Sequence, residues 1–300
     1  MSLKLTSIFA LVWNTSRGKT LAVTLAVILL SQSLAWHDMT LLHNKPLDYF
    51  LATIILSCCL LLQISVNLAN DYFDGLSGID NPQRLGPQRA IQAGLVKPTT
   101  MRNTIFITVI LACLCGLYLI FKGGLSFFFL GLLSLFGVYA YSGGKKPLAS
   151  LGLGELAVFL YFGYLGVMAS YVLQTGSFNN HLLLPATQIG LLISAIMLVN
   201  NIRDIDSDKA AGKKTLAVRI GHSRAKKLYG CLVTLPFLLI IFDYYQPYFN
   251  FLLLPASLYL CIKLQQTERS QGELFNRYLG QTSALVLAWS LLYSSSLMLN

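Results

Sequence analysis

The sequence contains few charged residues. Asp, Glu, Lys and Arg make up 11% of its 300 residues, whereas soluble globular domains carry about 25%. Hydrophobic residues make up 55% of the chain, and the mean hydropathy is +0.63. This composition excludes an ordinary soluble domain and indicates a protein that crosses a lipid bilayer several times. We expect an all-α helical bundle that forms a single domain over residues 1–300.

Acidic residues, histidines and cysteines are also scarce. There are 12 acidic residues against 22 basic ones, so the formal net charge is +10. A basic balance occurs in nucleic-acid-binding proteins, but here the basic residues gather in alternate loops, which is typical of membrane topology signals. We therefore expect no nucleic-acid partner. The 4 histidines and 6 cysteines show no spacing typical of a metal site.

Long apolar runs are what the sequence has in abundance. Each is near the ~20 residues that a membrane-spanning helix needs, and together they predict nine spans. The runs cover residues 20–36, 47–69, 103–121, 125–142, 153–174, 183–202, 228–245, 248–264 and 281–299. The first resembles a signal peptide with a cleavage site near Ala35, but the spans that follow lead us to expect a retained helix.

The basic residues predict the orientation of these spans. With the N-terminus in the cytoplasm, 20 of the 22 lysines and arginines lie on the cytoplasmic side, and Lys45 and Lys122 lie outside. Basic residues are enriched in cytoplasmic loops of membrane proteins. We therefore expect a multi-pass protein of the cell inner membrane, with the loops after spans two, four, six and eight in the cytoplasm.

The few acidic residues gather at the ends of two apolar runs. These clusters read Asn67-Leu-Ala-Asn70-Asp71-Tyr-Phe-Asp74 and Asn200-Asn-Ile-Arg203-Asp204-Ile-Asp206-Ser-Asp208. Residues three or four apart share a helix face, which groups Asn70 and Asp71 with Asp74, and Asp204 with Asp208. Ionisable groups at membrane depth are costly and usually functional. Polar loop caps would explain one such cluster, but they explain two poorly.

Carboxylates and amide carbonyls are oxygen ligands that suit Mg²⁺. Two facing acidic helix ends in a basic protein predict Mg²⁺ ions that bridge to a diphosphate. We expect the metal at Asn70, Asp74, Asp204 and Asp208, and count Asp71 with them as a catalytic candidate.

Neighbouring polar and basic residues are candidates for binding the diphosphate itself, because charged donors bind phosphate oxygens strongly. They are Asn67, Arg84, Lys97, Tyr141, Lys145 and Arg203. Each basic one is also explained as a topology charge, and Tyr141 as an aromatic residue of the membrane interface. A diphosphate that leaves an allylic chain would produce a delocalised cation. Aromatic side chains of the fourth and fifth spans would shield this cation, although simple packing also explains most of them.

The motifs resemble the UbiA-type superfamily of intramembrane prenyltransferases. The paired Asp clusters carry this resemblance, which runs over most of the chain. Other stretches resemble the branch that acts on 1,4-dihydroxy-2-naphthoate; they are Arg84-Leu-Gly-Pro-Gln-Arg89, Tyr141-Ser-Gly-Gly-Lys-Lys-Pro-Leu148, Gly152-Leu-Gly-Glu155 and Gly212-Lys-Lys-Thr-Leu-Ala-Val-Arg219.

The resemblance implies a Mg²⁺-dependent helical membrane enzyme. It would transfer a polyprenyl group from polyprenyl diphosphate to 1,4-dihydroxy-2-naphthoate, with loss of CO₂ and diphosphate, giving demethylmenaquinone. By position, the resemblance assigns metal binding to Asn70, Asp74, Asp204 and Asp208, and diphosphate contacts to Lys97, Tyr141 and Lys145.

Three alternatives remain open at this point. Relatives in the same superfamily prenylate 4-hydroxybenzoate, haem or chlorophyllide. The CDP-alcohol transferases also use intramembrane aspartates, but their Asp-Gly-x-x-Ala-Arg pattern is not matched by Asp74-Gly-Leu-Ser-Gly-Ile79. A transporter would place its ionisable residues near the bilayer midplane, whereas these lie at the ends of the spans.

Overall fold

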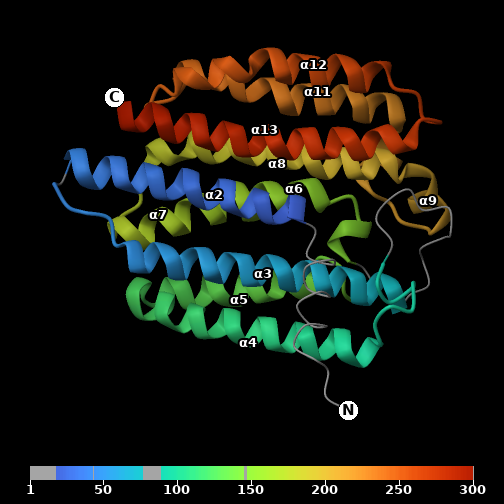
Figure 1. The fold of residues 1–300 in the computed structure, drawn as a ribbon, viewed down its shortest axis with the longest axis horizontal. Coiled ribbons are helices and arrows are strands. Elements are labelled where there is room, and N and C mark those ends of the chain that lie inside the picture. Colours follow the sequence, from blue (N-terminus) through green and yellow to red (C-terminus); the bar gives the residue numbers. More distant parts are fainter. Residues whose placement is uncertain (1–17, 43, 77–88, 145–146, 300) are drawn as a thin grey trace.

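The computed structural model describes residues 18–42, 44–76, 89–144 and 147–299, and within these ranges it is helical with no β-strand (Figure 1). The long helices are α2 (Gly18–His37), α3 (Tyr49–Leu76), α4 (Pro98–Gly123), α5 (Leu125–Ala140), α8 (Leu183–Arg203), α11 (His222–Leu239), α12 (Leu254–Gln266) and α13 (Gly272–Leu299). One further long helix consists of α6 (Gly154–Val158), the π-helix η3 (Phe159–Gly166) and α7 (Val167–Thr175). The short elements are η1 (Asp38–Leu42), η2 (Leu148–Ser150), η4 (Asn180–Leu182), α9 (Ile205–Ala210), α10 (Leu216–Ile220), η5 (Ile240–Phe242) and η6 (Tyr248–Leu253).

The helical membrane architecture predicted from the apolar runs is confirmed. Seven helical segments in the described ranges are long and apolar enough to cross a bilayer, and α5 is a shorter apolar helix. The eighth predicted span is less regular than expected, because it begins as the 3₁₀ segment η6 and continues as the 13-residue α12. The protein is therefore a multi-pass membrane protein.

The helix α8 lies at the centre of the bundle. Its apolar window is 72% buried, against 22% for those of α3 and α4, whose outer faces are left for lipid. It packs against α11, α13 and η3, while α2 packs against α13 and α7. In Figure 1, α11 and α12 form one side of the bundle and α4 and α5 the opposite side. This arrangement places α3 and α8, the carriers of the two acidic clusters, on either side of the α6–η3–α7 segment and α2.

Buried carboxylates join the helices at the end of the bundle away from those clusters. Asp38 accepts hydrogen bonds from the hydroxyls of Tyr171 at 2.6 Å and Tyr245 at 2.8 Å. Asp243 accepts one from the hydroxyl of Tyr293 at 2.9 Å. Buried polar groups need such partners to offset their lost hydration. These bonds tie η1, α7, α13 and the connection between α11 and α12 together.

Candidate active site

A cavity of about 760 Å³ opens among the helices that carry the acidic clusters. One end is polar and is formed by the ends of α3, α5 and α8, by α9 and by the start of α13. The remaining walls are largely apolar; they include Val27 of α2, Gly116 of α4, Gly131 of α5, Phe162 of η3 and Leu173 of α7. The cavity therefore offers a charged compartment that continues into space suited to a hydrocarbon chain.

The first polar wall is the C-terminal part of α3. This helix runs seven residues beyond the predicted span, to Leu76, so Asn70 and Asp74 stand one turn apart and both line the cavity. Arg89, only 4% exposed, donates to the Asn70 side-chain carbonyl at 2.7 Å and pairs with the Asp74 carboxylate. The Asn70 amide donates to the Ser142 hydroxyl at 2.8 Å. Both predicted ligands of this cluster are thus held by residues from other segments.

Asp71 has a different environment from its two neighbours. It is buried, and its carboxylate accepts hydrogen bonds from the backbone N–H groups of Ala90 at 3.1 Å and Ile91 at 3.4 Å. It does not line the cavity. Asp71 therefore holds the segment that carries Arg89 against α3, which is a positioning contact.

The second polar wall begins where α8 ends. The N–H groups of Asp204 and Asp208 donate to the carbonyls of Asn200 and Asp204, at 3.2 and 2.8 Å, so helical bonding continues across the break before α9. Both aspartates line the cavity, as the four-residue spacing predicts. Arg203 forms a two-pronged ion pair with Asp204 at 2.7 and 2.6 Å. It also donates to the side-chain carbonyl of Asn276 on α13 at 2.7 Å.

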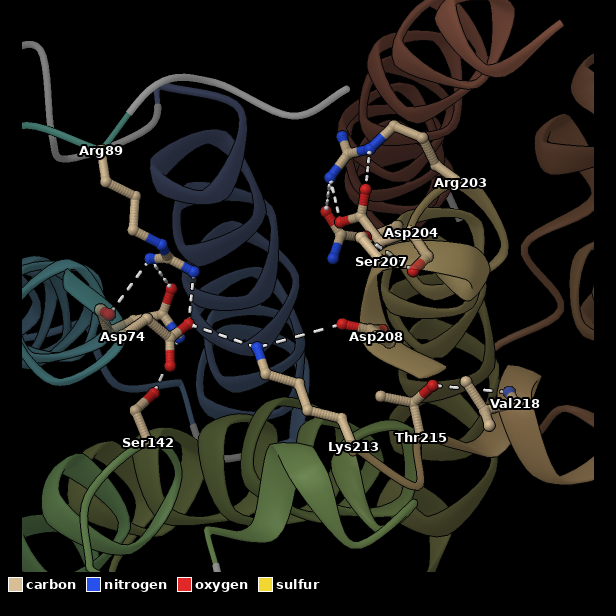
Figure 2. Close-up of polar contacts among 12 residues, drawn as sticks. Asp74, Arg89, Ser142, Arg203, Asp204, Ser207, Asp208, Lys213, Thr215 and Val218 are labelled. Carbon is tan, nitrogen blue, oxygen red and sulfur yellow. Dashed lines mark hydrogen bonds and ion pairs between the residues drawn. The ribbon is translucent and has the colours of Figure 1, made fainter. Parts of the chain in front are cut away.

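Lys213 connects the two walls. Its ammonium nitrogen lies 3.7 Å from a carboxylate oxygen of Asp74 and 3.9 Å from one of Asp208. Figure 2 shows this side chain between the two aspartates, with Arg89 above Asp74 and Arg203 above Asp208 in this view. Asp74 and Asp208 lie 134 positions apart in the sequence, so two distant clusters form one polar compartment in the described structure.

A buried glutamate lies behind the second wall. Glu155, 6% exposed, accepts a hydrogen bond from the side-chain amide of Asn201 at 2.8 Å, and Asn201 lines the cavity. The backbone carbonyl of Glu155 accepts another from the hydroxyl of Ser194 at 3.0 Å. The Gly152-Leu-Gly-Glu155 stretch thereby fixes an amide at the cavity wall.

The structure brings together most of the predicted site residues that it describes. Asn67, Tyr141 and Arg203 line the cavity together with Asn70, Asp74, Asp204 and Asp208, whereas Asp71 and the exposed Lys97 do not. Arg84 and Lys145 lie outside the described residues.

Sequence reasoning did not select several polar residues of the compartment. They are Arg89, Ser142, Lys213 and Asn276. The first three lie in stretches that carry the family resemblance, which is a usable signal. Asn276 lies in an unremarkable helix start, and only the packing of α13 against α8 places it there.

The oxygen ligands at this site fit a metal ion that a bound phosphate also helps to coordinate. Among the described residues no three His, Cys, Asp or Glu side chains gather as a self-sufficient metal group. Mg²⁺ commonly takes only one or two carboxylates from a protein and completes its shell with water and phosphate oxygens. The oxygen-only pairs Asn70 with Asp74, and Asp204 with Asp208, have this character.

Comparison with known proteins agrees with the motifs. Residues 25–279 match the model of the UbiA prenyltransferase family. The chain is 41% identical to the 1,4-dihydroxy-2-naphthoate octaprenyltransferase of Escherichia coli K12, over 72% of this chain and 70% of that protein. It is 33% identical to the protein of the same name from Bacillus subtilis 168, over 73% and 68%.

Solved structures share the fold. A UbiA homolog from Archaeoglobus fulgidus bound to GPP and Mg²⁺ superposes with a TM-score of 0.64 at 14% identity, over 95% of this chain and 99% of that one. A structure from work on digeranylgeranylglyceryl phosphate synthase in membranes gives 0.63 at 16% identity, over 100% of both chains. Identities this low show the fold alone. Together with the family match over most of the sequence, they lead to one conclusion: the chain belongs to the UbiA prenyltransferase family.

Proposed function

We propose that this protein transfers a polyprenyl group from polyprenyl diphosphate to 1,4-dihydroxy-2-naphthoate, releasing diphosphate and CO₂ and giving the prenylated naphthalene-1,4-diol, which is the reduced form of demethylmenaquinone. The observation that carries the proposal is the meeting of two acidic clusters at the polar end of a largely apolar cavity. The names of the Escherichia coli and Bacillus subtilis relatives support this acceptor.

The two compartments of the cavity match the two parts of the donor. The diphosphate would lie between Asp74 and Asp208, with Mg²⁺ held by Asn70 and Asp74 on one side and by Asp204 and Asp208 on the other. When bound, Mg²⁺ supplies positive charge that stabilises the departing diphosphate. Lys213 and Arg203 add fixed positive charge at the same place, because both line the cavity.

The apolar walls have a chemical role as well as a binding role. The carbon–oxygen bond of the donor breaks, diphosphate leaves with the electron pair, and an allylic cation remains. Phe127, Phe128, Tyr161 and Phe162 line the cavity, and their π faces favour a nearby cation. By excluding water, these walls favour attack by the naphthoate carbon that bears the carboxylate. The new carbon–carbon bond forms there, and the electrons of the broken bond to CO₂ return to the ring.

We also propose that the protein acts as a single domain of the cell inner membrane, with its polar compartment facing the cytoplasm. The distribution of 20 of 22 basic residues supports this orientation. The described ends of α3, α5 and α8 and the start of α13 lie together at one end of the bundle, as that topology requires.

A direct assay tests the reaction. Membranes containing the protein are given radiolabelled polyprenyl diphosphate, Mg²⁺ and one aromatic acceptor at a time. We expect labelled product with 1,4-dihydroxy-2-naphthoate, and release of labelled CO₂ when the acceptor carries the label in its carboxyl group. Product with 4-hydroxybenzoate but not with the naphthoate would contradict the acceptor. No transfer to any acceptor would contradict the activity.

A further inference from the structure

Lys213 occupies the position between the two acidic walls where opposite charge is needed most. Its ammonium nitrogen is 3.7 Å from Asp74 and 3.9 Å from Asp208. Its backbone N–H donates to the carbonyl of Asp208 at 2.8 Å, and that of Lys214 donates to the carbonyl of Ser150 at 2.9 Å. The turn that carries Lys213 is therefore anchored on both sides, and its side chain is directed into the cavity (Figure 2).

The contacts of Lys213 differ in kind from those of the nearby arginines. Arg203 holds Asp204 through two hydrogen bonds of 2.7 and 2.6 Å, which is the distance of strong charge-assisted bonds. The contacts of Lys213 are about 1 Å longer and are divided between two carboxylates. A lysine ammonium is a compact charge on a flexible stem, whereas a guanidinium is a rigid fork. Of the described cations in the compartment, Lys213 is thus the one that can be displaced with the least loss of bonding.

A cation between two carboxylates reduces their mutual repulsion, which is strong where water is scarce. Asp74 and Asp208 are each 9% exposed, and the Lys213 side chain is 15% exposed. A divalent cation that approaches these carboxylates meets the same oxygens and the same repulsion from the ammonium. The ammonium and the metal therefore compete while the compartment holds no diphosphate.

We propose that Lys213 is an internal counter-ion that holds the place of the divalent cation between the acidic walls, and that it transfers its contacts to the diphosphate when metal and donor bind. This inference rests on the proposed function, because it takes a metal–diphosphate complex as the ligand. It has two consequences of opposite sign. Without diphosphate, Lys213 weakens metal binding; with diphosphate, it strengthens binding of the donor.

The test uses the purified full-length protein in detergent and two binding measurements that require no turnover. The first is titration with Mn²⁺ alone, followed by the electron paramagnetic resonance of the free ion. The second is the affinity for geranyl S-thiolodiphosphate, an unreactive analogue, at saturating Mg²⁺. For Lys213→Met we expect Mn²⁺ to bind about tenfold more tightly than to the wild type, and the analogue to bind at least about tenfold more weakly.

Two variants control for other causes. Lys214→Met removes the same charge from an exposed neighbour, and we expect both affinities to stay within about twofold of the wild type. Lys213→Arg keeps the charge, so its Mn²⁺ affinity should stay near that of the wild type. If Lys213→Met does not purify as a monodisperse protein, Lys213→Gln replaces it with the same expectations.

Each outcome has a separate meaning. Mn²⁺ affinity that is unchanged or weaker in Lys213→Met overturns the place-holding role. Analogue affinity that is unchanged overturns the transfer of contacts to the diphosphate. A wild-type protein that binds the analogue in the presence of metal supports the proposed function whichever way the Lys213 variants behave. A wild-type protein that binds neither Mn²⁺ nor the analogue overturns the proposed function, and this inference with it.

Discussion

Removing the guanidinium of Arg89 should destabilise the folded protein as well as the first wall of the site. Arg89 is 4% exposed and donates to the side-chain carbonyl of Asn70 at 2.7 Å and to its backbone carbonyl at 3.1 Å. It also pairs with the carboxylate of Asp74. The substitution Arg89→Ala would leave these acceptors in a compartment with little water to replace the lost donors.

The size of the effect follows from the geometry. Removing one partner of a buried ion pair costs about 3–5 kcal/mol. Lys213 remains 3.7 Å from Asp74 and keeps part of the compensation, so we take the lower end, about 3 kcal/mol. With an unfolding entropy of about 2.1 cal/mol/K per residue, one kcal/mol shifts the melting temperature of this 300-residue chain by roughly 1.6 °C. Arg89→Ala should therefore melt about 5 °C below the wild type.

Thermal unfolding of the purified protein in detergent, followed by intrinsic fluorescence, provides the assay. Arg102→Ala is a matched control, because Arg102 is exposed on α4. Arg89→Lys should fall between the wild type and Arg89→Ala, since a lysine keeps the charge but loses the fork. If Arg89→Ala melts within about 2 °C of Arg102→Ala, Arg89 does not stabilise the compartment as the geometry indicates.

Three further predictions concern the cavity, the opposite end of the bundle and the topology. Gly116 lines the cavity, and a Cβ added there meets no atom within 4 Å. Gly116→Phe should therefore raise the KM for a long polyprenyl diphosphate at least about tenfold. The KM for geranyl diphosphate should stay within about threefold of the wild-type value. Burial raises the pKa of Asp243 to about 6 from an ordinary 3.8. The stability that this carboxyl contributes is therefore present below about pH 4 and is lost as the pH rises through 6. The melting temperature of Asp243→Asn should rise relative to that of the wild type between pH 4 and 7. The basic residues predict that the loops of Ser177 and Ser223 lie on opposite sides of the membrane. On intact cells, an impermeant thiol reagent should label Ser177→Cys but not Ser223→Cys, above the labelling of the native cysteines in the wild type.

Each of these has a clear contrary result. An equal rise of KM for both donors in Gly116→Phe would mean that the side chain disturbs the polar end and not the tail. A constant difference in melting temperature across the pH range would show that burial does not raise the pKa of Asp243. Labelling of Ser223→Cys from outside would reverse the topology.

The sequence predicts much of the fold, because membrane helices must be long, apolar and internally hydrogen-bonded. Apolar length alone does not show where a helix ends once it leaves the bilayer. The helix α3 continues to Leu76 and α13 begins at Gly272, nine residues before the predicted start. Nor does it reveal the π-helix in the fifth span or the 3₁₀ start of the eighth, since both depend on packing between helices.

The site shows the same division between local and tertiary information. The four-residue spacing of Asn70 with Asp74, and of Asp204 with Asp208, is a local property, and the structure places all four at one cavity. The spacing does not distinguish Asp71, whose carboxylate is turned to the Ala90 and Ile91 amides. Of the cations that surround the carboxylates, Arg203 adjoins Asp204 in the sequence, but Arg89 and Lys213 reach Asp74 from other segments. No local pattern specifies those last two contacts.

The central claim is that the two acidic clusters act as one unit, and a double-mutant comparison of turnover tests it most directly. Asp74→Asn, Asp208→Asn and the double variant are purified and assayed for prenyl transfer at low and at high Mg²⁺. Residues that act as a unit have strongly non-additive effects. Each single variant should lose nearly all turnover at low Mg²⁺, and the double variant should be scarcely worse than either. A single variant that keeps near wild-type turnover at low Mg²⁺, or losses that simply multiply in the double variant, would contradict the claim.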